Sequence, residues 1–202
     1  AEMFENASEK AKELNTSIKN IINSTAEFAK LGFSTEQSQA LAEVANVYAN
    51  VGELDIQSAT ESLVSTINGF KDLNADDAWK IIDEFNNVGN KFSISSAGIG
   101  EALKRSAASL SESNNSLEES IALVTTANSV IQDPEKVGTA LRTMSLRIRG
   151  VKAELEKAGL ETDGMVESTA KLRDLVMAAT GVDILEKDQK TFRSTYEILL
   201  DI

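Results

Sequence analysis

The stretch from Pro134, the only proline of the chain, to Gly159 constrains the fold more than any other part of the sequence. Its apolar side chains recur at steps of three and four residues, at Val137, Leu141, Met144, Ile148, Val151 and Leu155. This spacing is typical of the apolar stripe along one side of an α-helix. A proline in the first turn and a glycine after the last turn are common helix boundaries. We therefore predict one long helix over residues 134–159.

This predicted helix also concentrates positive charge. Three of the six arginines of the chain lie in it, at Arg142, Arg147 and Arg149. At about 100° per residue, Arg142 and Arg149 project within roughly 20° of each other and well away from the apolar stripe. With Lys152, they form the candidate partner-contact site. Because the chain has 32 acidic against 20 basic residues, pairing with its own carboxylates is the alternative.

Composition favours helix and excludes several classes of function. The 202 residues include one proline, 11 glycines, no cysteine and no histidine, with a formal net charge of −12. Without thiolate or imidazole, the chain lacks the usual zinc ligands and the usual proton shuttle. Its negative charge argues against direct binding to nucleic acid, and no apolar run reaches the roughly 18 residues of a membrane span. We expect no enzyme activity, no cofactor, no metal and no membrane span in this chain.

Two segments resemble ligand-binding motifs but lack a defining residue. Residues 72–83 begin like a calcium loop, yet Asp77 stands where the sharp turn needs glycine, and the last residue is aspartate rather than glutamate. Gly98-Ile-Gly100 lacks the third glycine of a dinucleotide loop and the strands around it. We interpret Asn74 as a helix cap and the glycines as positions of close helix packing.

The first 31 residues carry a strict heptad pattern. Its apolar and small positions are Phe4, Ala7, Ala11, Leu14, Ile18, Ile21, Thr25 and Phe28. Such a pattern predicts a long N-terminal helix over 1–31, either coiled-coil-like or an ordinary amphipathic helix on a bundle. Gly32 is expected to end it.

The middle of the chain repeats itself in three segments, 34–67, 74–107 and 115–148. Each opens with a helix-capping signal, and matching positions hold the same residue type in Asn46, Asn86 and Asn128. A spacing of about 40 residues suits one helix pair per unit, although chance similarity among alanine-rich helices is the alternative. We predict a core domain over 32–159 with three helix pairs, arranged as an array or a bundle. The segment 117–131 is apolar almost all round, so we place it at the centre.

The last part of the chain, 160–202, is predicted to be a helical extension that is truncated. A helix is expected to begin at Ser168 and to end at Gly181. Residues 182–185 form either a short strand or a buried connector. The fold class is therefore all-α, with at most one minor strand, and we expect the chain to be a fragment of a longer protein.

Three motifs, in this order and spacing, resemble the core region of phage tail tape measure proteins from tailed phages and prophages of Gram-positive bacteria. The first is Ser93-Ile-Ser-Ser-Ala-Gly-Ile-Gly-Glu-Ala-Leu-Lys-Arg-Ser-Ala107, followed by Asn115-Ser-Leu-Glu-Glu-Ser-Ile-Ala-Leu123. The second is Pro134-Glu-Lys-Val-Gly-Thr-Ala-Leu-Arg-Thr-Met-Ser-Leu-Arg-Ile-Arg149. The third is Gly181-Val-Asp-Ile-Leu185, leading to Phe192-Arg-Ser-Thr-Tyr-Glu-Ile-Leu199. The resemblance extends over roughly residues 30–202.

The resemblance implies a virion structural protein that sets tail length, takes part in tail assembly and leaves with the DNA during genome delivery. It implies as partners the tail tube protein, tail assembly chaperones, tail tip or baseplate proteins, and other copies of the chain. The implied location is the tail lumen of the virion, and the host cytoplasm during assembly. The rival interpretation is a cellular α-helical repeat scaffold or adaptor.

Overall fold

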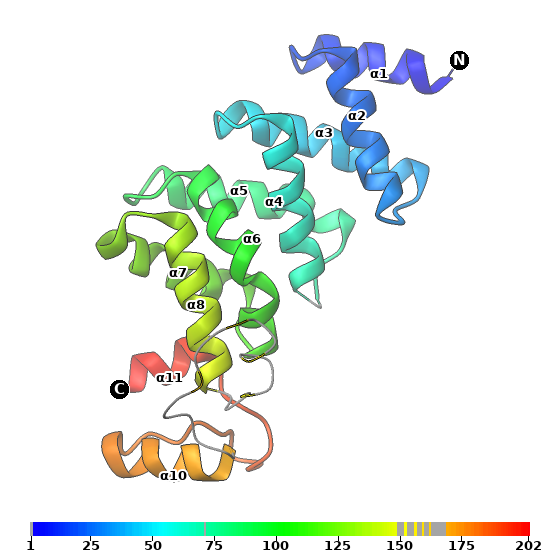
Figure 1. Ribbon diagram of the computed structural model, residues 1–202. Coiled ribbons are helices and arrows are strands. Elements are labelled where there is room, and N and C mark those ends of the chain that lie inside the picture. The colour runs from blue at the N-terminus through cyan, green and yellow to red at the C-terminus, as the bar shows by residue number, and fades with distance from the viewer. Residues whose placement is uncertain are drawn as a thin grey trace.

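The computed structural model of this chain describes residues 2–70, 72–148, 152, 156, 159, 162 and 169–202. Within these residues the regular structure consists of α-helices and one short 3-10 helix, without a strand (Figure 1). The all-α prediction is confirmed. The helices are α1 Glu2–Glu13, α2 Ile18–Lys30, α3 Thr35–Val51, α4 Ile56–Gly69, η1 Ala75–Asp77, α5 Ala78–Gly89, α6 Ser96–Glu112, α7 Leu117–Ile131, α8 Pro134–Ile148, α10 Thr169–Thr180 and α11 Thr195–Asp201.

Successive helices fold back on each other as pairs, and the pairs stack side by side along one direction (Figure 1). The three predicted repeats correspond to the pairs α3–α4, α5–α6 and α7–α8. The second helices of the pairs form a continuous row, since α4 packs on α6 and α6 packs on α8. We call this arrangement the helix-pair array.

Local capping explains where the helices of the array begin. The Ser34 and Ser116 side chains each accept a hydrogen bond from the backbone N–H three residues on. In turn, the Ser34 and Ser116 backbone N–H groups donate to the side chains of Gln37 and Glu119. These reciprocal bonds satisfy backbone N–H groups that have no partner inside the helix. The second helices α4 and α6 begin after Asp55 and Ser95, whose side chains accept hydrogen bonds from the Ser58 and Gly98 N–H groups.

The predicted single N-terminal helix is wrong, because residues 14–17 form a turn between α1 and α2. Asn15 adopts a left-handed conformation with φ 51°, and the Ser17 side chain caps α2 by accepting a hydrogen bond from the Asn20 N–H. The heptad positions Ala7, Ala11 and Ile21 are buried against one another in a small separate core. Two short helices folded together therefore produce the same apolar spacing as one long helix.

The main core lies between the two rows of helices and has α6 at its centre, not α7 as predicted. α6 packs against α4, α5, α7 and α8, and its Ile99 and Leu103 are fully buried. The first half of α7 is buried, but Val130 near its end is 83% exposed and Ile131 is 41% exposed. The stripe of α8 likewise packs mainly on α6 rather than on α7. Its predicted continuation through Val151 and Leu155 lies outside the described residues.

The C-terminal segment returns to the array after α10. Gly181, with φ +77°, ends α10 as predicted, and Val182 and Ile184 are buried. Residues 182–185 form no strand; Leu185 makes a single antiparallel bridge to Phe192. α11 then docks on the turn between α6 and α7, where the Tyr196 N–H donates to Asn115 Oδ1 at 2.9 Å.

Candidate interaction surfaces

The two rows of the array differ in charge. The first helices α3, α5 and α7 carry one cation, Lys80, against six carboxylates: Glu36, Glu43, Asp83, Glu84, Glu118 and Glu119. The second helices α4, α6 and α8 carry five cations and four carboxylates. The cations are Lys104, Arg105, Lys136, Arg142 and Arg147, and the carboxylates are Glu61, Glu101, Glu112 and Glu135. One face of the array is therefore acidic, and the other is balanced.

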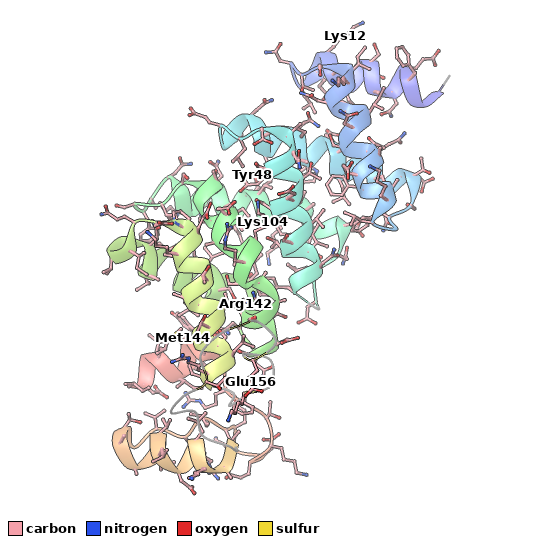
Figure 2. The ribbon with its side chains drawn as sticks, viewed as in Figure 1. Lys12, Tyr48, Lys104, Arg142, Met144 and Glu156 are labelled. Carbon is pink, nitrogen blue, oxygen red and sulfur yellow. The ribbon has the colours of Figure 1, made fainter. Side chains whose placement is uncertain are left out.

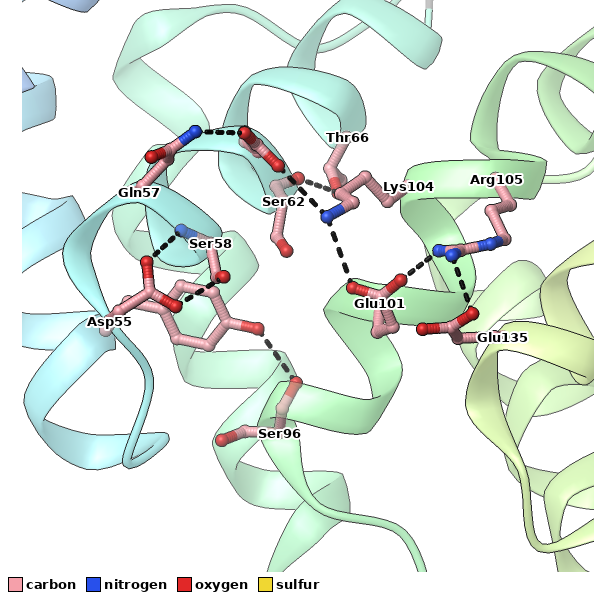
Figure 3. A network of polar contacts seen from close by, with 12 residues as sticks. Asp55, Gln57, Ser58, Ser62, Thr66, Ser96, Glu101, Lys104, Arg105 and Glu135 are labelled. Carbon is pink, nitrogen blue, oxygen red and sulfur yellow. Dashed lines mark hydrogen bonds and ion pairs between the residues drawn. The ribbon is translucent and has the colours of Figure 1, made fainter.

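A chain of polar contacts crosses the second helices (Figure 3). On α6, Lys104 Nζ lies 3.1 Å from Glu61 Oε2 of α4 and 3.3 Å from Glu101 Oε2. Arg105 pairs with Glu101 and, across to α8, lies 2.9 Å from Glu135 Oε2. Hydrogen bonds from Gln57 and then Lys104 lower the pKa of Glu61. Because these side chains are partly solvated, each pair contributes at most about 1 kcal/mol, and their main effect is to fix the register of three neighbouring helices.

The structure describes two of the three predicted partner-contact residues, Arg142 and Lys152. Arg142, labelled in Figure 2, is exposed on α8 and forms no ion pair with any residue that the structure describes. Lys152 is exposed and its Nζ lies 4.0 Å from Glu156 Oε1. Arg149 lies outside the described residues. Among the described residues, Arg142 is therefore not paired with a carboxylate of the chain itself.

An open groove runs along the exposed side of α8 next to α6. Its rim carries Arg105, Lys136 and Arg147, and its apolar side chains are Ala140, Met144 and Ile148. Arg142 does not line this groove.

The glycines of the sequence motifs serve helix packing. A Cβ atom on Gly138 would collide with the backbone carbonyl of Ala102, so glycine lets α8 approach α6 to backbone contact. A Cβ atom on Gly100 would likewise collide with the Tyr48 hydroxyl, which donates to Ser96 O at 2.9 Å. Gly100 is thus a packing residue, as the sequence suggests. Its partner Tyr48 could not be identified from the sequence, because the contact joins residues 52 positions apart.

The segment that resembles a calcium loop is a helix start. Asn74 Oδ1 accepts a hydrogen bond from the Asp76 N–H, and the Asp77 carboxylate accepts one from the Asn74 N–H. Over the described part of the chain, no group of three acidic side chains is arranged to hold a metal ion. Nor is any described helix long and apolar enough to cross a membrane.

Stacked helix pairs with capped ends and glycine contacts define an α-helical repeat protein of the kind that presents extended surfaces to other proteins. The chain belongs to the phage-related minor tail protein family, which it matches over residues 8–198. No solved structure matches it. Family membership makes the chain a component of the phage tail and indicates a structural role with other tail components as partners. It also argues against the cellular scaffold interpretation.

Proposed function

We propose that this chain is part of a tape measure protein, which sets tail length and takes part in tail assembly and genome delivery. The observation that carries the proposal is the match to the minor tail protein family over residues 8–198. The order and spacing of the three tape measure motifs add to it. The family also suggests a structural role rather than catalysis.

The helix-pair array supports a specific part within that function. A straight helix of 40 residues spans about 60 Å, because each residue adds 1.5 Å. A stacked helix pair of the same length advances by about one interhelical distance, roughly 10 Å. Per residue, the array therefore adds about one sixth of the length that a continuous helix would add along the tail. We assign it as a folded assembly or docking module, with the domain boundaries 1–31, 32–159 and 160–202 as working limits.

Tail length tests this assignment. In the gene that encodes this chain, one helix pair, residues 74–114, is deleted, and tails are measured by electron microscopy. A module that stays folded predicts tails shortened by at most about 10 Å, or a failure of assembly. Shortening by about 60 Å would mean that this region lies extended along the tail, and it would overturn the module assignment.

The proposed partners are the tail tube protein, tail assembly chaperones, tail tip or baseplate proteins and other copies of the chain. The proposed location is the tail lumen, with the host cytoplasm during assembly. The exposed Arg142, together with Arg149 and Lys152, is the proposed contact for one of them. Changing Arg142 and Arg149 to Glu should weaken co-purification with tail proteins while circular dichroism stays unchanged. Loss of helical signal would instead identify the arginines as internal ion-pair residues.

A further inference from the structure

The acidic face of the array contains a small apolar groove between α3 and α5. Val47 and Val51 of α3 form one side, and Trp79 and Ile82 of α5 form the other. Trp79 is 45% exposed and Val51 is 52% exposed, so both side chains present apolar surface to solvent. The groove holds about 60 Å³, which is room for a small aliphatic side chain.

The floor of the groove is formed by buried side chains. Tyr48 also lines it and is buried, with its ring 5.9 Å from that of Phe85 in an edge-on arrangement. The Tyr48 hydroxyl donates to Ser96 O at 2.9 Å, which ties α3 to the start of α6. Because the floor is held by buried contacts from three helices, the groove is formed before anything binds to it. Preformed sites avoid the entropy of ordering on association.

The rim of the groove is negative. The Asp83 carboxylate lines it, is exposed, and forms no ion pair with a residue that the structure describes. The one lysine of the acidic face, Lys80, is turned to other carboxylates, at 2.9 Å from Glu118 Oε1 and 3.6 Å from Glu84 Oε1. The charge around the exposed indole is therefore uncompensated and favours a cationic ligand.

We propose that this groove binds a basic amphipathic helix of a partner protein, which inserts one aliphatic side chain between Val51 and Trp79. Tryptophan is among the residues that dominate binding energy at protein interfaces, and its ring also attracts cations placed over its face. The neighbouring lysines or arginines of the bound helix lie against Asp83. This inference rests on the groove and its charge, and it holds whether or not the chain sets tail length.

Trp79 is the only tryptophan of the chain, so its fluorescence reports on the groove directly. The probe is a synthetic helical peptide of lysine and leucine with an amphipathic pattern, compared with a scrambled peptide of the same composition and with a glutamate–leucine counterpart. We expect the amphipathic basic peptide alone to shift the emission of Trp79 to the blue and to protect it from acrylamide. An equal response to the scrambled or the acidic peptide overturns the proposal.

Variants locate the binding and keep the reporter in place. Val51→Ser and Asp83→Lys should each weaken binding of the basic peptide about tenfold or more, a change of about 1.4 kcal/mol. The matched control is Val130→Ser, because this exposed valine lies on α7 outside the groove; it should bind as the unchanged protein does. Equal losses in Val51→Ser and Val130→Ser contradict the proposal. So does a blue shift that grows with protein concentration without peptide, because a second copy would then fill the groove.

Discussion

At the scale of single residues, Gly138 shows how one missing side chain sets the distance between two helices. α8 meets α6 at the backbone of Ala102, where even a methyl group on Gly138 would collide. In an open helix position, Gly→Ala stabilises a protein by about 1 kcal/mol. At Gly138 the same substitution is expected to destabilise the protein by about 1–3 kcal/mol, because the added methyl group would collide with the backbone of Ala102.

Chemical denaturation of Gly138→Ala measures this effect. The control is Thr139→Ala, an exposed neighbour on α8 that should change the free energy of unfolding by less than about 0.5 kcal/mol. A Gly138→Ala protein as stable as the original would show that α6 and α8 have room to separate.

Asp183 ties the segment after α10 to that helix, and this contact depends on pH. Hydrogen bonds from the Arg173 guanidinium, including one from Nε at 2.7 Å, hold the pKa of the Asp183 carboxyl at about 2. Because the folded pKa lies below the ordinary value of 3.8, the contact stabilises the fold above about pH 4 and is lost as the pH falls toward 2.

An NMR titration of the carboxyl groups tests this pKa. Arg173→Gln should bring the pKa of Asp183 back toward 3.8. The pKa of Asp188 is lowered instead by hydrogen bonds from Thr191 and should not move. An unchanged Asp183 in Arg173→Gln would show that the arginine does not cause the shift.

At the scale of helices and turns, the repeated asparagine acts as a link between neighbouring helix pairs. Asn46 is buried and donates to Ala42 O at 2.8 Å and to Ser24 Oγ at 3.2 Å, and it accepts from the Thr16 hydroxyl. Asn128 is also buried and donates to Ser93 O in the turn of the preceding pair. Asn86, at the equivalent position, is exposed and bonds only locally to Asn90.

These differences predict unequal effects of one substitution at two of the three matched positions. Asn46→Ala should destabilise the protein by about 1–3 kcal/mol, because it leaves buried partners without hydrogen bonds. Asn86→Ala should change the free energy of unfolding by less than about 0.5 kcal/mol, since it lies on the surface. Thermal or denaturant unfolding compares the variants, and similar losses at both positions would refute the role of Asn46 as a link between pairs.

At the scale of the whole molecule, the main contacts between the described helices join neighbouring pairs of the array, so stability is expected to vary along the chain. α1 shares a small core of Ala7, Ala11 and Ile21 with α2, apart from the main core. α6, by contrast, packs against four other helices.

Hydrogen exchange should reveal this gradient. Amides of α1 are expected to exchange through local opening, faster than those of α6, whose exchange requires unfolding of the main core. Equal protection of α1 and α6 would mean that the chain unfolds in a single step.

Small-angle scattering adds a second measurement, since stacked pairs predict a radius of gyration above the roughly 17 Å of a globular domain of this length.

The sequence by itself determined the all-α class and the starts of α3 and α7. These follow from local rules, because a cap such as Ser34 or Ser116 and the spacing of apolar residues act within one or two helical turns. Family motifs within the repeats also indicated a phage tail protein, and the family match agrees.

The tertiary structure alone decided which helix lies at the centre and where the chain folds back. The heptad pattern of 1–31 fits one helix as well as two, and only the packing of Ala7 and Ala11 against Ile21 distinguishes them. Apolar content placed α7 in the centre, yet the exposed Val130 shows that burial depends on neighbours and not on composition. The groove at Trp79 could not be predicted for the same reason. Its two walls come from α3 and α5, and a contact between distant segments produces no periodic pattern in the sequence.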